Sequence, residues 1–119
     1  MSIFDKLLNK NSENWPNDAD GDVLRRMKEC NFDFSKAHSI DFNIDLQEWP
    51  PRQELIDILI KRYGDTEGYE PSEDMNGYLL FQINDQLTYE LVLKIQDEAT
   101  QLAAPYGGIC ESWGVMQDE

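Results

Sequence analysis

The sequence predicts an α+β fold: a ferredoxin-like β-α-β-β-α-β antiparallel sheet with two helices on one face, preceded by one or two N-terminal helices. One segment alternates apolar and polar residues with a period of two, and two later segments repeat apolar residues at helical spacing. Turns that contain Gly or Pro separate these segments. After residue 37 their order is strand, helix, strand, strand, helix, strand, which is the order of two split β-α-β units.

Two helical patterns precede the predicted sheet. Residues 2–9 have one apolar side, and residues 11–16 form a connector. The next helix has three aspartates at its start, within residues 18–22, where the helix dipole favours negative charge, and basic residues towards its end. Asn31 is its expected stop.

The first strand is expected over residues 38–46. Its even-numbered positions from 40 to 46 are apolar and its odd-numbered positions are polar, which predicts a half-buried strand. Alternation places Asp41 and Asp45 together on the polar face. The plain interpretation of that face is a solvated surface, and the alternative is an acidic docking surface.

The remaining elements are predicted from the spacing of apolar residues and from the Gly and Pro residues at element boundaries. Pro51 is expected in the first turn of a helix with a broad apolar face, which ends at Gly64. A weak strand, a turn, a strand, a second turn, a long helix and a last strand follow. They are expected over residues 66–70, 71–77, 78–83, 84–86, 87–102 and 109–116, before an acidic tail.

The length of 119 residues predicts one domain, with residues 1–16 as N-terminal helix and connector and residues 17–117 as its body. No apolar run approaches the ~20 residues that span a bilayer, and the first residues lack the pattern of a secretory signal. We interpret Cys30 and Cys110 as reduced thiols of a cytoplasmic protein.

The charge balance excludes one class of partner and favours another. The chain has 24 acidic residues against 10 Lys and Arg, a net charge of −14. Phosphates must be neutralised by Lys and Arg, so direct nucleic-acid binding is not expected. From Tyr63 onward there are twelve acids and one base, Lys94. The sequence therefore predicts a basic protein partner, attracted most strongly by the second half of the chain.

Residues for catalysis are few, so no enzyme, cofactor or metal site is expected. His38 is the only histidine, and neither a nucleophile elbow nor a phosphate-binding glycine loop is present. The aspartate-rich run before Val23 fails as a calcium loop, because Pro16 and Met27 fall where the first and twelfth ligands belong. A hydrolase with paired carboxylates would need a cleft that holds both.

Several motifs resemble a known family. The runs DGDVLRRM (20–27), FDFSK (32–36) and HSIDF (38–42) occur in order, and YGGICESWG (106–114) follows near the end. Together they resemble the regulator of ribonuclease E activity B family over roughly residues 15–116. Three positions depart from the expected pattern, with Asn, Ala and Ser in place of Gly, Pro and Gly. They are Asn31, Ala37 and Ser112.

The resemblance implies a ferredoxin-like fold and a non-enzymatic protein that binds ribonuclease E and alters which RNAs it cuts. It also implies a basic, RNA-binding segment of that enzyme as the target, for which an acidic protein is physically suited. The alternative is an immunity-like or nucleic-acid-mimicking protein that blocks a different basic protein, because fold does not determine function.

The candidate partner-binding residues are acids of the second half of the chain, the two strand aspartates and one tryptophan. Trp113 is expected in the core if its side chain points inward, and as an interface anchor if it points outward beside Glu111. The full set is Asp41, Asp45, Glu70, Glu73, Asp74, Glu111 and Trp113.

Overall fold

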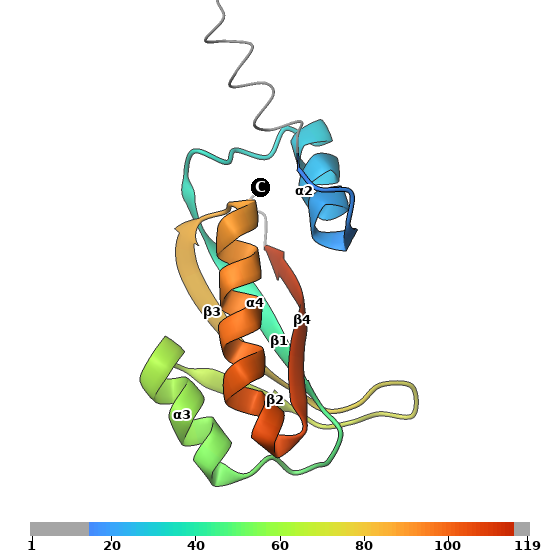
Figure 1. The fold of residues 1–119 in the computed structure, drawn as a ribbon, viewed down its shortest axis with the longest axis vertical. Helices are drawn as coiled ribbons and strands as arrows, with labels where there is room; N and C mark the ends of the chain where they lie inside the picture. Colours follow the sequence, from blue (N-terminus) through green and yellow to red (C-terminus); the bar gives the residue numbers. More distant parts are fainter. Residues whose placement is uncertain (1–14, 116–119) are drawn as a thin grey trace, which may run out of the picture. The chain divides into compact units, whose positions relative to one another are not determined.

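A computed structural model describes residues 15–115, which divide into two compact units (Figure 1). The first unit ends at Ser35 and the second begins at Lys36. The helix expected over residues 2–9 and the acidic tail lie outside the described residues. That residues 1–119 act as a single domain stays a prediction.

Helix α2 (Ala19–Glu29) of the first unit begins where the aspartates predicted it. The Asp18 side chain is its N-cap and accepts a hydrogen bond of 2.8 Å from the Gly21 amide. A Cβ at Gly21 would lie 2.0 Å from the Pro16 carbonyl oxygen, so the tight approach of the preceding chain requires glycine there.

The end of α2 explains one departure from the family pattern. Asn31 has a φ of +65°, and its amide donates to the Lys28 carbonyl at 3.0 Å. The Phe32 amide donates to the Met27 carbonyl at 3.0 Å, which completes a Schellman cap. This cap needs the left-handed conformation that Gly adopts freely and Asn tolerates. The stop predicted at Asn31 is confirmed.

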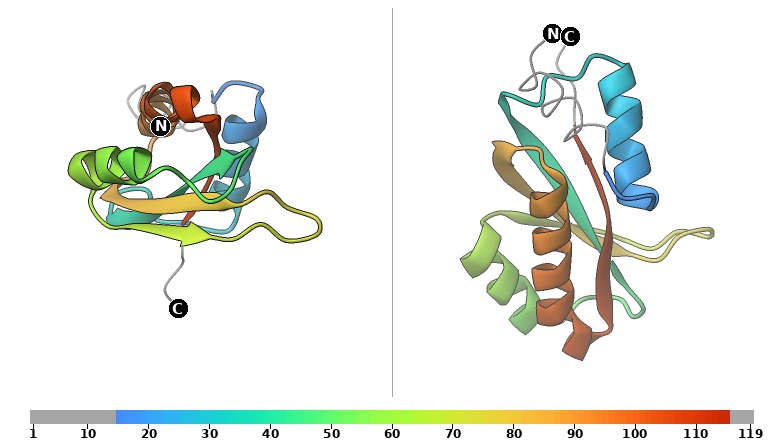
Figure 2. Two further views of the ribbon diagram at one scale, coloured as in Figure 1. Left: turned by 90° about the horizontal axis from the view of Figure 1, so that it is seen from below. Right: turned by 45° about the horizontal axis from the view of Figure 1, so that its top comes forward.

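The second unit contains a four-stranded antiparallel sheet in the order β2-β3-β1-β4. Figure 2 shows α3 and α4 on the same face of this sheet. The α+β class and the antiparallel sheet are therefore confirmed. The elements are β1 (Ala37–Leu46), α3 (Gln53–Tyr63), β2 (Thr66–Tyr69), β3 (Tyr78–Gln86), α4 (Tyr89–Ala103), the 3₁₀ turn η1 (Ala104–Tyr106) and β4 (Gly108–Val115).

Two boundary predictions are wrong. Helix α3 begins at Gln53, so Pro51 lies before the helix and not in its first turn. Strand β3 continues to Gln86, where a turn over residues 84–86 was predicted. The extension arises because β1 is long enough to pair with β3 as far as Ala37 opposite Gln86. Tertiary pairing here overrides the local turn propensity of Asn and Asp.

The core lies between the sheet and its two helices. The even-numbered residues of β1 from 40 to 46 are at most 2% exposed, as the alternation predicted. Phe81 of β3 stacks between two other rings, with its centroid 4.2 Å from that of Tyr63 and 5.6 Å from that of Phe42. Helices α3 and α4 complete the core with Leu55, Leu59, Val92, Ile95, Ala99 and Ala103.

A polar cluster joins the two helices. Glu98 of α4 accepts hydrogen bonds from Arg62 at 3.0 Å and from the Tyr63 hydroxyl at 3.3 Å. Burial and the nearby Glu98 carboxylate raise the pKa of Tyr63 to about 12. The hydrogen bond from Arg62 lowers the pKa of Glu98 below its usual value.

We expect Glu98→Gln to destabilise the protein at neutral pH by about 1 kcal/mol or less, since the ion pair is partly exposed. Because folding lowers the pKa of Glu98, its contribution is complete above about pH 4.5 and is lost as the pH falls through the folded value. Urea unfolding should therefore distinguish the variant from wild type at neutral pH, and the difference should shrink as the pH falls below the usual pKa of a glutamate. Glu48→Gln is the matched control. A difference that persisted at low pH would contradict the assignment.

Candidate functional site

Charge is unevenly distributed within the second unit. Helices α3 and α4, with the N-cap Arg52, hold five acids and four bases, whereas the remaining residues from Lys36 to Val115 hold ten acids and only Lys36 as a base. Strands β1–β4 carry no Lys or Arg. The ten acids are Asp41, Asp45, Glu48, Asp65, Glu67, Glu70, Glu73, Asp74, Asp85 and Glu111.

The strand register brings several polar residues to the sheet face opposite α3 and α4, which we call the outer face. Asp41 lies opposite Gln82 of β3, and Asp45 lies opposite Tyr78. Directly opposed residues share one face of a sheet, so the register assigns the whole set. The outer face consists of Ala37, Ser39, Asp41, Asn43, Asp45, Glu67, Tyr69, Tyr78, Leu80, Gln82, Asn84, Gln86, Ile109, Ser112 and Gly114.

Hydrogen bonds between strands orient the polar side chains of this face. Gln82 donates from Nε2 to Asp41 Oδ1 at 2.7 Å. Asn43 donates from Nδ2 to the Ser112 hydroxyl at 3.0 Å, so the serine that replaces an expected glycine ties β1 to β4. The Asn43 Oδ1 atom is buried and has no hydrogen-bond partner among the described residues. This buried acceptor is therefore unsatisfied, and the surrounding side chains close it to solvent.

Two tyrosines form an aromatic pair on the same face. Tyr69 of β2 and Tyr78 of β3 are directly opposed, with ring centroids 4.9 Å apart and planes inclined by 15°. The Tyr69 hydroxyl donates to Glu67 Oε1 at 2.9 Å. That hydrogen bond raises the pKa of the Tyr69 hydroxyl, and the Asp41 carboxylate adds a smaller effect of the same sign.

Glu67, Tyr69 and Tyr78 were not among the site residues predicted from the sequence. The spacing of Glu67 and Tyr69 by two places them on one face of a strand, and this signal was available. Their proximity to Tyr78 and Asp41 depends on the pairing of β2 with β3 and of β3 with β1, which no local pattern reveals.

The structure separates Trp113 from the two aspartates. The register of β4 shifts between its pairs with Asn43 and Ile44, and Glu111 is the extra residue of a β-bulge. After the bulge Trp113 lies opposite Phe42, whose side chain is in the core, so the half-buried indole belongs to the helix-covered face. Glu111 itself is exposed at the bulge.

Three of the predicted acids lie in the loop between β2 and β3. Glu70, Glu73 and Asp74 are exposed, and the loop extends away from the sheet (Figure 1). The Ser72 amide donates to the Met75 carbonyl at 2.9 Å and closes the tip. Because the loop joins Tyr69 to Tyr78, these acids lie beyond the ends of β2 and β3 at which the two tyrosines pair.

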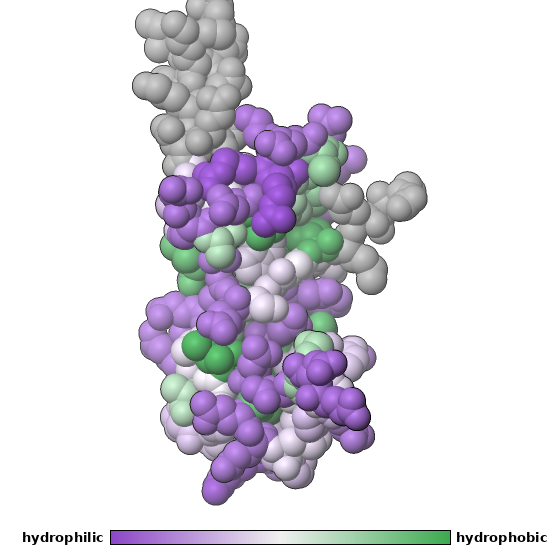
Figure 3. Space-filling view, turned by 90° about the vertical axis from the view of Figure 1, so that its right-hand side faces the viewer, coloured by the Kyte–Doolittle hydropathy of each residue, from purple (hydrophilic) through white to green (hydrophobic). Residues whose placement is uncertain are grey.

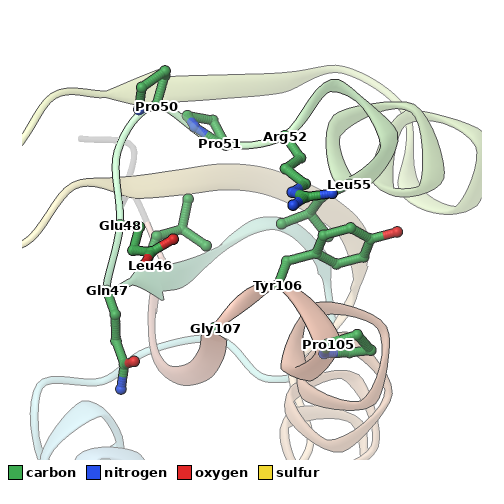
Figure 4. Close-up of a pocket in the computed structure, with 10 residues that line it drawn as sticks. All are labelled: Leu46, Gln47, Glu48, Pro50, Pro51, Arg52, Leu55, Pro105, Tyr106 and Gly107. Atoms are coloured by element: carbon green, nitrogen blue, oxygen red, sulfur yellow. The ribbon is translucent and has the colours of Figure 1, made fainter.

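Two cavities of the second unit bear on the hypothesis of a hydrolase with paired carboxylates. The cavity of about 380 Å³ beside η1 has Glu48 as its single acidic lining residue, and Figure 4 shows Arg52 next to the Tyr106 ring on another side of it. The groove between α3 and α4 likewise has one acid, Glu98, which is paired with a base. Neither contains the two carboxylates that such a hydrolase requires.

Residues 15–115 offer neither a metal centre nor a membrane-crossing helix. No group of three His, Cys, Asp or Glu side chains there is placed to hold a metal ion. No helix in this part of the chain has the length and apolar character to cross a membrane. Cys30 and Cys110 are not joined by a disulfide. Hydrophilic residues predominate on the side shown in Figure 3, where apolar residues form only small separate patches.

The fold and the charge distribution define the class: an acidic α+β protein with a polar, tyrosine-bearing sheet face. A family model described as Regulator of ribonuclease activity B matches residues 17–115, and the chain belongs to this family. A comparison with curated proteins found no match. Membership confirms the resemblance drawn from the sequence motifs and implies regulation of ribonuclease activity.

Proposed function

We propose that this protein is a non-enzymatic regulator of RNA degradation in the cytoplasm that binds ribonuclease E through the outer face and the adjoining β2–β3 loop. The observation that carries the proposal is the concentration of ten acids and a single base on the strands and loops of the second unit. Family membership supports the choice of a ribonuclease as partner.

We further propose that the second unit has the ferredoxin-like arrangement. The strand order β2-β3-β1-β4 supports this, with α3 joining β1 to β2 and α4 joining β3 to β4. Helices on one face leave the other face of the sheet to be lined by the polar residues of alternating strand positions.

The physical basis of regulation is competition for a basic segment. A segment of the endonuclease that holds RNA does so with Lys and Arg side chains that neutralise phosphates. The carboxylates of the outer face and loop attract the same side chains and raise the encounter rate. A segment that is bound to this protein has fewer free cations for RNA, so the choice of substrate changes without any chemistry performed by the regulator.

A salt-graded pull-down from lysate tests the proposal. We expect immobilised full-length protein to recover ribonuclease E at about 50 mM salt and less of it at about 200 mM, because screening weakens exposed charge pairs. An Asp41→Asn/Asp45→Asn bait should recover less than wild type. An Asp57→Asn/Glu54→Gln bait carries the same charge change on α3, and it should recover as much ribonuclease E as wild type.

The alternative of a different basic target has a distinct outcome in the same experiment. Recovery of another basic protein without the endonuclease would overturn the proposed partner while retaining the acidic docking face. Addition of purified protein to purified ribonuclease E with an RNA substrate then checks regulation directly, and an unchanged cleavage pattern at saturating protein would contradict it.

A further inference from the structure

We propose that Tyr69, Tyr78, Glu67 and Asp41 form a subsite selective for arginine over lysine. A guanidinium of the partner would stack on the exposed tyrosine face and donate hydrogen bonds to a neighbouring carboxylate. The inference rests on the proposed function, since it specifies which side chain of a basic segment the outer face recognises.

The placement of the tyrosines suits a stacking ligand. Strand β2 is at the edge of the sheet, and Tyr69 is 40% exposed, which makes it one of the few large apolar side chains on the surface of the second unit. Its ring is nearly parallel to that of Tyr78, at 15° and 4.9 Å. The pair therefore presents a flat, rigid aromatic surface to which a planar cation binds with little loss of conformational entropy.

The carboxylates beside the rings are held in place and keep acceptor capacity. The bond from the Tyr69 hydroxyl occupies Oε1 of Glu67, and the bond from Gln82 occupies Oδ1 of Asp41. A carboxylate offers about four lone-pair positions, so each group retains sites for the donors of a guanidinium.

Arginine fits this combination better than lysine for two physical reasons. Its guanidinium is planar, weakly hydrated and able to stack on an aromatic ring while its edge donates to a carboxylate. The lysine ammonium is a compact and strongly hydrated charge, and it gains little from a flat aromatic surface. Charge attraction alone would bind arginine and lysine equally well. A preference for arginine therefore measures the contribution of the tyrosine rings apart from the attraction by the carboxylates.

Two peptides of equal charge test the inference. Each has ten residues, with four arginines or four lysines separated by Gly and Ser, and is titrated into the full-length protein by calorimetry at low salt. We expect the arginine peptide to bind about fivefold more tightly. In Tyr69→Leu/Tyr78→Leu the preference should disappear while the affinity for the lysine peptide is retained. Tyr106→Leu removes an aromatic ring from the cavity beside η1 and should behave as wild type.

The outcomes separate the subsite from the proposed function. Equal affinity of wild type for both peptides, or a preference that survives in the double variant, overturns the subsite and leaves the acidic docking face standing. Failure to bind either peptide overturns both. Far-UV circular dichroism checks that the double variant folds. If it does not, the same two titrations with Tyr69→Leu test the subsite, because this exposed side chain lies on the edge strand.

Discussion

Asp41→Lys/Asp45→Lys should slow association with a basic partner about 10-fold to 100-fold at low salt, because both substitutions reverse the charge near the middle of the outer face. The two carboxylates lie on the central strand β1, flanked by β3 and β4, where no described strand residue is basic. The dependence of the rate constant on salt should flatten at the same time. Stopped-flow measurements over a range of ionic strength give both quantities.

A matched control removes the effect of net charge. Glu54→Lys/Asp57→Lys changes the charge by the same amount on α3, which lies on the helix-covered side of the sheet. This control should retain most of the association rate. If both variants slow binding equally, total charge and not the outer face governs the encounter, and the docking face must be sought elsewhere. The exposed acids Glu70, Glu73 and Asp74 are then the next to be tested.

Phe81→Ala should destabilise the protein by about 3–5 kcal/mol, a large share of the stability of a small protein. Phe81 is 1% exposed and stacks on both Tyr63 and Phe42, so truncation removes contacts with α3 and with β1 and leaves a cavity. The expected fall in melting temperature is more than about 10 °C. Urea unfolding followed by circular dichroism provides the free energy.

The conservative substitution Phe81→Leu keeps most of the apolar volume and should be markedly more stable than the alanine variant. Leu93→Ala is the exposed control, since this α4 side chain is 42% exposed and its truncation should change little. A loss of unfolding free energy below about 1 kcal/mol for Phe81→Ala would show that the core collapses into the cavity and that the aromatic stack is not central to stability.

Local patterns were sufficient to predict β1 and the position of its two aspartates. Burial alternates along the strand from Ile40 to Leu46 as the sequence alternates, because successive side chains of a pleated strand point to opposite faces of the sheet. The helix α2 was equally predictable, since capping and dipole effects act within a few residues. Asn31 marked its end because few other residues tolerate a positive φ.

The site's aromatic component and the orientation of Trp113 were not predictable in this way. Tyr69 and Tyr78 are separated by a loop, and only the β2–β3 register makes them neighbours. Trp113 lies on the helix-covered face because the single extra residue Glu111 shifts the alternation of β4 by one. Such a shift leaves no mark on composition or periodicity.

By itself the sequence determined the α+β class, the family and the excess of acid, because these depend on composition, short-range periodicity and recognisable motifs. Only the tertiary structure decided which acids share a face, that tyrosines accompany them, and that the bases of the second unit gather mainly on its helices. The physical reason is that strand pairing joins residues far apart in the chain, and one residue of register exchanges the two faces of a strand.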